Sequence, residues 1–339
     1  MNRPVTIALD ASGGDFGPGV VVPAALDVLR KHTNVHLILV GDEAAIRNEL
    51  ARPEDTRLRI HHATQRVEMS ESPAQALRKK KDSSMRVVID MVKNGEADAC
   101  VSAGNTGALM ATARYVLKTL PGIDRPAIIT RIPAIGGYTH MLDLGANVDC
   151  TAEHLYQFAV MGSELVAVVT GDPRPRVGLL NIGEEVIKGN ERVKEAGQLL
   201  ERSDLNYIGY VEGDDIYTDA VDVVITDGFV GNVSLKTSEG VAKMIIHYIR
   251  ESFSRNVVTR IVGLMAKPVL RRFRDLIDPR MYNGASLVGL QGIVIKSHGG
   301  ADVFAFANAV EIAIVEVAKD LPKRIHKRLE QQFRARKSA

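Results

Sequence analysis

Short apolar segments rich in β-branched residues alternate along the chain with amphipathic segments of helical periodicity. Most apolar segments end in a turn that contains glycine. The expected strands are Val5–Leu9, Val35–Val40, Ala99–Ser102, Ile128–Thr130, Met141–Asp143, Val177–Asn181 and Val221–Thr226. The expected helices are Val20–Lys31, Glu43–Leu50, Ala108–Lys118, Glu153–Met161, Asn190–Leu200 and Val233–Ile249. This alternation predicts an α/β fold in which helices cover both faces of a mostly parallel sheet.

Residues 250–280 depart from this alternation, because they are expected to be helical and basic with no strand between. Apolar residues recur at helical spacing on both sides of Pro268, which is expected to separate two helices. Six Arg or Lys residues and a single acid lie between residues 254 and 275. Two interpretations stay open: a helical hairpin packed on a partner subunit, and a cationic amphipathic surface that lies on anionic lipid. The candidate lipid contacts are Ile261, Leu264, Met265, Val269, Leu270 and Phe273.

Composition narrows the class of protein. A chain of 339 residues with 45% hydrophobic residues can fold as one large domain, here 1–339 in two halves with a seam near 171–175. A net charge of +2 gives no global reason to expect nucleic-acid binding. Two isolated cysteines, Cys100 and Cys150, form neither a disulfide framework nor a metal pair. No apolar run reaches about 18 residues, so we expect a cytoplasmic protein without a membrane span.

Five turns at the carboxyl ends of expected strands are rich in Gly, Asn, Ser, Thr and Asp. Ligands bind at this edge of an open parallel sheet, where glycine exposes backbone amides and helix N-termini supply unpaired donors. Together the turns predict an anion site, for phosphate above all, although any one alone is more often a plain structural turn. Neither GxGxxG nor GxxxxGK[ST] occurs with its proper spacing. The candidate residues are Asp10, Gly13, Gly14, Asp15, Ser102, Asn105, Thr106, Asn147, Asn181, Gly183, Glu184, Asp227 and Gly231.

Three further residues are candidates for chemistry. Lys188 is the only cation inside these five turns, and it is either a solvated helix residue or a charge that holds phosphate and stabilises an oxyanion. Asn232 is either a helix N-cap or a donor to a carbonyl oxygen. His298 is a conceivable general base, but a structural role is favoured because phosphate needs little deprotonation.

Six motifs follow one another in the order known from the PlsX family of phosphate acyltransferases, which the chain resembles over its whole length. They are DASGGDFGP, SAGNTGALM, LDLGANVD, NIGEE-x-x-KGN, DGFVGN-x-x-LKT-x-EG and GASLVGLQGIVIKSHG, with Ser12 where methionine is usual.

The resemblance implies a three-layer αβα sandwich similar to phosphotransacetylase and isocitrate dehydrogenase, usually as a homodimer. It further implies transfer of a long-chain acyl group from acyl-carrier protein to inorganic phosphate, with Lys188 and Asn232 important for activity. The acyl phosphate would pass to a membrane glycerol-3-phosphate acyltransferase, and the enzyme would bind the inner face of the cell membrane peripherally.

The chemistry requires neither a cofactor nor a metal nor an enzyme nucleophile. A thioester is already activated, and phosphate is largely dianionic near neutral pH, so direct attack without an acyl-enzyme is expected. A phosphate acetyl- or butyryltransferase that uses acyl-CoA is the nearest alternative. A decarboxylating dehydrogenase would want a metal–carboxylate cluster, and an inert membrane-surface scaffold is supported only by residues 250–280.

Overall fold

The computed structural model describes residues 3–50 and 55–338, and the side chains of 274–277, 279 and 333–338 lie outside this description. Its described strands form one sheet of eleven, in the order β3-β2-β1-β4-β11-β10-β5-β6-β9-β7-β8. They are β1 Val5–Asp10, β2 Val35–Gly41, β3 Leu58–His62, β4 Ala99–Ser102, β5 Ala127–Ala134, β6 Gly137–Leu142, β7 Val177–Leu180, β8 Tyr207–Val211, β9 Val223–Ile225, β10 Ala285–Val288 and β11 Ile293–Lys296. Seven of the ten strand pairs in the described sheet are parallel, which confirms the mostly parallel prediction.

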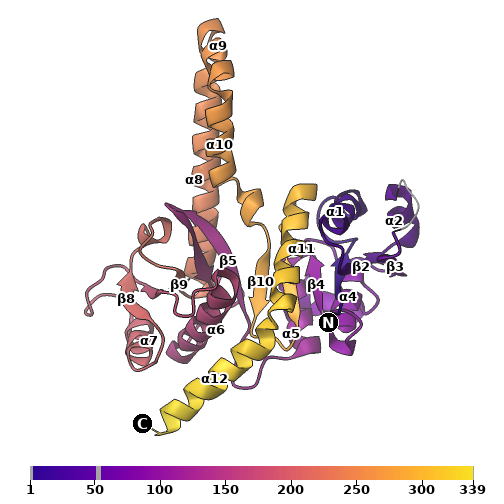
Figure 1. Ribbon diagram of the computed structural model, residues 1–339. Coiled ribbons are helices and arrows are strands. Elements are labelled where there is room, and N and C mark those ends of the chain that lie inside the picture. The colour runs from indigo at the N-terminus through magenta and orange to yellow at the C-terminus, as the bar shows by residue number, and fades with distance from the viewer. Residues whose placement is uncertain (1–2, 51–54, 339) are drawn as a thin grey trace.

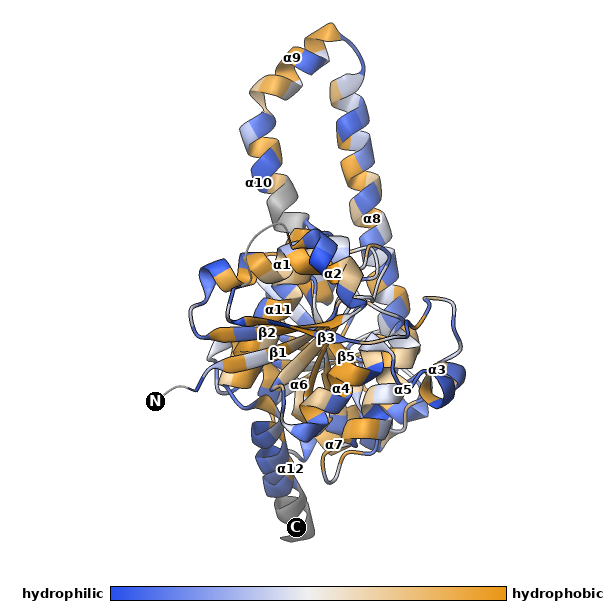
Figure 2. Cartoon of the chain, turned by 90° about the vertical axis from the view of Figure 1, so that its right-hand side faces the viewer, coloured by the Kyte–Doolittle hydropathy of each residue, from blue (hydrophilic) through white to orange (hydrophobic). Residues whose placement is uncertain are grey.

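Helices cover both faces of this sheet (Figure 1). They are α1 Pro18–Lys31, α2 Glu43–Glu49, α3 Pro73–Lys79, α4 Ser84–Asn94, α5 Thr106–Leu117, α6 Ala152–Thr170, α7 Glu191–Glu201, α8 Gly228–Ser254, α9 Val257–Met265, α10 Lys267–Ile277, α11 Val303–Ala318 and α12 Leu321–Ser338, with 3-10 turns η1 Asp215–Tyr217 and η2 Pro279–Tyr282. Figure 2 shows β1 and β2 between α1 and α11 on one side and α4 and α5 on the other. The predicted αβα layering is confirmed.

Alternate residues of the central strands explain why these strands read as continuous apolar runs. Ala8 and Cys100 pack with the apolar residues of α4 and α5, whereas Leu9 and Val101 pack with those of α1 and α11. A strand that is buried on both faces needs apolar side chains at every position, so its sequence shows no polar alternation.

The parallel strands fall into two blocks that run in opposite directions. β1, β2, β3, β4 and β11 form one block, and β6, β9, β7 and β8 form the other. Between the blocks, β10 and β5 pair antiparallel with each other and with their outer neighbours. Neighbouring strands of a twisted sheet are rotated by about 20–25°, so the six steps from β1 to β9 add up to about 120–150°. Because this rotation approaches a half turn, it offsets much of the difference in direction between the strands of the two blocks.

Two helices are longer than their sequence patterns predicted. α6 continues from Ala152 to Thr170, nine residues beyond the expected end at Met161. The helix continues through Gly162. A Cβ there would lie 2.9 Å from a methyl carbon of Val223, so the glycine lets α6 pack closely on β9. α8 begins at Gly228 rather than Val233 and runs for 27 residues. The expected seam at 171–175 lies between α6 and β7, and its role as a boundary stays a prediction.

Residues 250–280, for which a helical excursion is expected, contain the end of α8, α9, α10 and η2. The end of α8, together with α9 and α10, forms a hairpin that stands away from the sheet (Figure 1). Pro268 lies in the first turn of α10, one residue after the break between α9 and α10, as expected for a residue that separates two helices. Within the described residues, no helix combines the length and the apolar composition that crossing a membrane requires.

Candidate active site

The loops that follow β1, β4 and β11 meet at one end of the sheet, and we call residues 10–17, 102–107 and 297–302 the first loop group. The Ser102 hydroxyl donates a hydrogen bond of 2.6 Å to Oδ2 of Asp10, and the Gly104 amide donates to the Ser102 oxygen at 3.1 Å. The Asp15 amide donates to the Gly299 carbonyl at 2.9 Å. Three loops that are distant in sequence are thereby joined.

Asp10 lies beneath this group and is 1% exposed. Burial raises the pKa of its carboxyl group, and hydrogen bonds from Ser102 and Ser84 lower the pKa by less. A Cβ on Gly13 would lie 2.5 Å from Oδ2 of Asp10, so only glycine allows the loop to fold over this carboxylate. Asp10 therefore supports the loops from below, and Gly14 and Asp15 carry the chain across them.

Asn105, Thr106 and His298 lie at the rim of the first loop group. Asn105 caps α5, because its Oδ1 accepts from the Ala108 amide at 2.9 Å, and Thr106 is the first residue of that helix. Nδ1 of His298 accepts from the Gly300 amide at 3.1 Å, so the neutral ring carries its proton on Nε2. Burial lowers the pKa of His298.

The loops that follow β6 and β9 form a second loop group, residues 143–149 and 226–232, which is built around Asp143. This fully buried carboxylate accepts from the amides of Ile128 at 2.9 Å and Asn147 at 2.7 Å. The side-chain amide of Asn147 donates to Asp143 at 2.9 Å and to the Pro126 carbonyl at 2.8 Å. Burial raises the pKa of Asp143 in spite of these bonds.

The first turn of α8 packs directly on this second group. Asp227 is the N-cap and accepts from the Val230 amide at 2.9 Å. A Cβ on Gly231 would lie 2.0 Å from the Asp143 carbonyl oxygen, so the helix approaches as closely as glycine permits. Asn232 is therefore not the N-cap. It is exposed inside the helix, beside Gly145, whose Cβ would lie 3.4 Å from that of Asn232.

The loop after β7, residues 181–190, holds Lys188 at the surface. Its ammonium pairs with the Glu185 carboxylate at 2.9 Å, and this bond raises the pKa of Lys188. The Asn181 side chain donates to the carbonyls of Gly183 at 3.0 Å and Lys188 at 3.3 Å, which closes the loop on itself. A Cβ on Gly183 would lie 2.4 Å from Cδ of Lys188, so this glycine leaves room for the lysine chain. Glu184 is exposed.

α8 connects the second loop group with the first. It begins beside Asp143, and one turn after Asn232 it carries Lys236, whose ammonium pairs with Glu239 at 2.9 Å. The charge of Lys236 adds to the effect of burial in lowering the pKa of His298, whereas Glu239 on the same helix raises that pKa. The first turns of α8 thus contact the second loop group around Asp143 and act electrostatically on His298 of the first loop group. No contact joins Lys188 to Asn232 among the described interactions.

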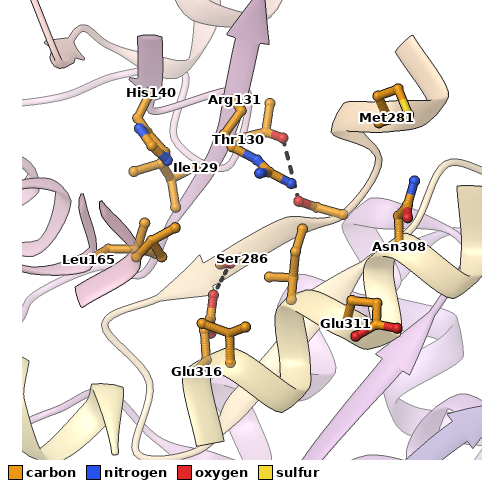
Figure 3. A pocket seen from close by; sticks show the side chains of 14 residues that line it. Ile129, Thr130, Arg131, His140, Leu165, Met281, Ser286, Asn308, Glu311 and Glu316 are labelled. Carbon is orange, nitrogen blue, oxygen red and sulfur yellow. Dashed lines mark hydrogen bonds between the residues drawn. The ribbon is translucent and has the colours of Figure 1, made fainter. Parts of the chain in front are cut away.

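A separate cavity of about 200 Å³ lies between α6 and α11 over β5, β6 and β10 (Figure 3). Its walls are largely apolar, and its polar residues include Arg131, His140 and Glu316. The Ser286 hydroxyl donates to the Glu316 carboxylate, which is 2% exposed. Burial raises the pKa of Glu316 to about 7 and lowers the pKa of His140 to about 3.

Among the described residues, we find neither a reactive thiol nor a metal site. Burial raises the pKa of the Cys100 thiol, and it raises that of Cys150 to about 11, so both stay protonated near neutral pH. Within residues 3–50 and 55–338, no three His, Cys, Asp or Glu side chains are grouped so that they could hold a metal ion.

Comparison with known proteins connects this geometry with a reaction. The profile of a family described as "Fatty acid synthesis protein" matches residues 5–324. A curated phosphate acyltransferase of Methylococcus capsulatus is 64% identical over 98% of this chain and 99% of its own length. Another, from Alkalilimnicola ehrlichii, is 63% identical over the full length of both chains. The chain belongs to the PlsX family of phosphate acyltransferases. It is therefore an enzyme that transfers acyl groups to phosphate, and the matched family connects it with fatty acid synthesis.

Solved structures confirm the expected fold. A phosphotransacetylase from Streptococcus pyogenes superposes with a TM-score of 0.64 at 18% identity, covering 94% of this chain and 95% of that one. A 4-hydroxythreonine-4-phosphate dehydrogenase from Klebsiella pneumoniae gives a TM-score of 0.53 at 12% identity, covering 94% and 100%. At this low identity, the similarity shows that these proteins share the fold of this chain.

Three residues of the site were not predicted from the sequence. Asp143 and Lys236 lie inside the quoted motifs, but only the structure shows that Asp143 accepts from the Asn147 amide and that Lys236 acts on His298. Lys296 ends β11 inside the apolar segment before His298, and it is 9% exposed. A lysine at the end of a buried strand is a signal that sequence reasoning could have used, because a lysine is rarely so buried.

Proposed function

We propose that this acyltransferase takes a long-chain fatty acyl group from an acyl-carrier-protein thioester and transfers it to inorganic phosphate by direct attack. The observation that carries the proposal is the set of glycine-rich loops at strand ends, two of which are joined by the first turns of α8. Such loops offer backbone N–H donors to an anion without a bound metal. Both thiols are protonated, which agrees with a reaction that has no acyl-enzyme.

The step itself is a simple substitution at the thioester carbonyl. A phosphate oxygen forms the new C–O bond, the tetrahedral oxyanion collapses, and the C–S bond breaks to release the carrier thiolate, which takes a proton from water. Phosphate needs little deprotonation, and a thiolate leaves readily because thiol pKa values lie near 8.5. The protein therefore has to position phosphate and stabilise the oxyanion.

Lys188 is proposed to bind phosphate, and Asn232 is proposed to bind the thioester carbonyl. The ammonium of Lys188 binds phosphate in place of Glu185, since a dianion attracts it more strongly than one exposed carboxylate does. The side-chain amide of Asn232 is exposed beside Gly145 and donates to the thioester carbonyl oxygen. Both positions are solvent-accessible, as substrate-binding groups must be.

The test is phosphate-dependent consumption of a long-chain acyl-carrier thioester, with acyl phosphate identified as the product. Lys188→Ala is expected to lower turnover by about 10²–10³-fold, and Lys188→Arg to keep part of it. Glu185→Gln, the matched variant, is expected to lower the KM for phosphate because a competing anion is removed. Wild-type activity in Lys188→Ala would exclude this lysine from the mechanism.

The choice of donor separates the main proposal from the alternative reaction. Acyl-CoA and acyl-carrier thioesters of equal chain length are offered at equal concentration in the same assay. A preference for short acyl-CoA would identify a phosphate acetyl- or butyryltransferase instead. Trapping of a stable acyl group on Cys100, Cys150 or a serine would exclude direct attack.

The hairpin of α8, α9 and α10 is proposed to rest on the anionic inner face of the cell membrane, as a peripheral contact. α9 has no buried residue, and Figure 2 shows it as mainly hydrophobic at the far end of the hairpin. Met265 is 78% exposed and Val269 72%, and Ile261, Leu264 and Phe273 are exposed too, with Leu270 half-buried. Exposed arginines and Lys267 lie on the same helices, which suits anionic lipid.

Flotation with liposomes that contain anionic lipid tests this contact. The double variant Leu264→Glu, Val269→Glu is expected to lose flotation, because two carboxylates would enter the lipid interface. Ile135→Glu, which changes an equally exposed apolar residue at the tip of the β5–β6 hairpin, is the control and should float as the wild type does. Unchanged flotation of the double variant would place the lipid contact elsewhere.

The remaining assignments concern partners. An acidic acyl-carrier protein is proposed as the donor, a membrane glycerol-3-phosphate acyltransferase as the acceptor of the product, and a second copy of the chain as a homodimer partner. Size-exclusion chromatography with light scattering tests the dimer, and cross-linking to carrier protein tests the donor.

A further inference from the structure

The side chain of Lys296 lies beneath the first loop group rather than in solvent. It ends β11, where its backbone pairs in register with Ser102 of β4 and Ala285 of β10. Its ammonium donates to the Ala103 carbonyl at 3.3 Å and to the Ser297 carbonyl. One buried cation therefore ties the loop after β4 to the loop after β11.

The charges that face this ammonium come from several elements. Asp10 at the end of β1 and Asp15 in the following loop stabilise the charge, and Lys236 of α8 opposes it. His298 is the next titratable group along the chain, and its pKa is lowered in part by Lys296. Burial lowers the pKa of Lys296 to about 8. A charge in such a place costs stability, so its presence here calls for a role besides packing.

The bonds to the two carbonyls have a geometric consequence. A carbonyl that points inward to the ammonium fixes the peptide plane, and so fixes the direction of the N–H groups around it. The loop after β4 continues from Ala103 through Gly104 to Asn105, the N-cap of α5, whose first N–H groups lack an acceptor within the helix. The loop after β11 continues from Ser297 to His298. The N–H groups of the same two peptide planes, those of Gly104 and His298, donate to the Ser102 hydroxyl at 3.1 Å and to Oδ1 of Asn283 at 2.9 Å, so both planes are fixed on both sides.

We propose that Lys296 is a positioning residue for acyl transfer to phosphate: its buried ammonium holds the carbonyls of Ala103 and Ser297 and so orients the first loop group toward the phosphate. This inference rests on the proposed function, because it assigns the first loop group to the phosphate that reacts. Lys296 touches neither substrate, and it acts only while it is charged. Loss of its proton removes the charge that strengthens both hydrogen bonds, so the neutral amine holds the two carbonyls more weakly and the loops misalign.

The test is the pH profile of kcat/KM for phosphate, measured from pH 6 to 10 with an acyl-carrier thioester. The wild type is expected to lose activity above about pH 8, where Lys296 loses its charge. Phosphate is fully dianionic there, so its own titration does not produce this loss. Lys296→Arg keeps the charge at all these pH values and is expected to move the alkaline limit upward by more than one pH unit.

Lys296→Met, which keeps the length but not the charge, is expected to lower kcat/KM by about 10²-fold at pH 7 and to show no alkaline limit near pH 8. Lys319→Met, an exposed lysine after α11, is the matched control and should keep the wild-type profile. Thermal unfolding is measured for each variant. If Lys296→Met does not fold, the wild type and Lys296→Arg still decide the question.

Each outcome has one meaning. An alkaline limit that stays in place in Lys296→Arg, or a wild-type profile in folded Lys296→Met, overturns the role of Lys296 and leaves the proposed function intact. A wild type that does not consume the acyl-carrier thioester in the presence of phosphate overturns the proposed function, and the role of Lys296 with it.

Discussion

Glu316 of α11 is a carboxyl group that the fold keeps out of water. It is 2% exposed, lines the cavity between α6 and α11, and accepts a hydrogen bond from Ser286 (Figure 3). Glu316→Gln keeps the size of the side chain and an acceptor for that hydrogen bond, but removes the proton that Glu316 can release. The variant therefore isolates the cost of a buried negative charge.

The magnitude follows from the difference between two pKa values. Burial raises the pKa of Glu316 from an ordinary 4.5 to about 7 in the folded protein. The stability of the neutral form is thus fully present below pH 4.5, is lost as the pH rises through 7, and then stays constant. The difference corresponds to at most about 3 kcal/mol, which for a chain of this length is about 4 °C in Tm.

Thermal unfolding followed by circular dichroism at pH 5 and pH 8 measures this effect. Glu316→Gln is expected to raise the Tm by about 4 °C at pH 8 and by much less at pH 5. Glu195→Gln, on the exposed face of α7, serves as the control and should change the Tm little at either pH. An equal Tm for Glu316→Gln and the wild type at pH 8 would show that the carboxylate finds water or a cation that the structure does not reveal.

Three other variants test the site. Cys100→Ala with Cys150→Ala should keep phosphate-dependent turnover within about twofold, because neither thiol reacts; a loss above tenfold in a folded double variant would point to covalent chemistry. Gly231→Ala should lower both Tm and turnover, since its Cβ would lie 2.0 Å from the Asp143 carbonyl oxygen; unchanged values of both would contradict the tight packing of α8. Asn232→Ala should lower kcat by about 10²-fold with little change in Tm, and a Tm loss without a kcat loss would make Asn232 structural.

Three strands of the first block could be predicted from the sequence because both of their faces are buried. β1, β2 and β4 read as nearly continuous apolar runs and were placed within a residue or two. β3 and β8 were missed because they lie at the two edges of the sheet, where solvent reaches them. β10 and β11, of four residues each, were missed although they are largely buried at the centre of the sheet. The antiparallel turn between β5 and β6 was missed too, since strand direction depends on partners and not on composition.

The site could be predicted only in part for a related reason. The motifs identified the loops correctly as turns at strand ends, because glycine and capping residues have local causes such as the cap of α5 by Asn105. The sorting of those loops into separate groups depends on the reversal between the two strand blocks, which no short motif contains. The depth of Lys296 likewise depends on packing by β1, β4 and α8.

One unbroken helix runs from Asn232, the residue proposed to bind the thioester carbonyl, toward the tip of the hairpin, and its length has a consequence for the proposed reaction. From the Cα of Asn232 to that of Ser254, α8 rises by 22 residue steps of about 1.5 Å, or about 33 Å. If the tip rests on lipid, the helix acts as a spacer that keeps the reacting carbonyl at a set height above the bilayer. The acyl phosphate then does not form in contact with the membrane. It has to reach the bilayer either by diffusion through water or by transfer to another protein.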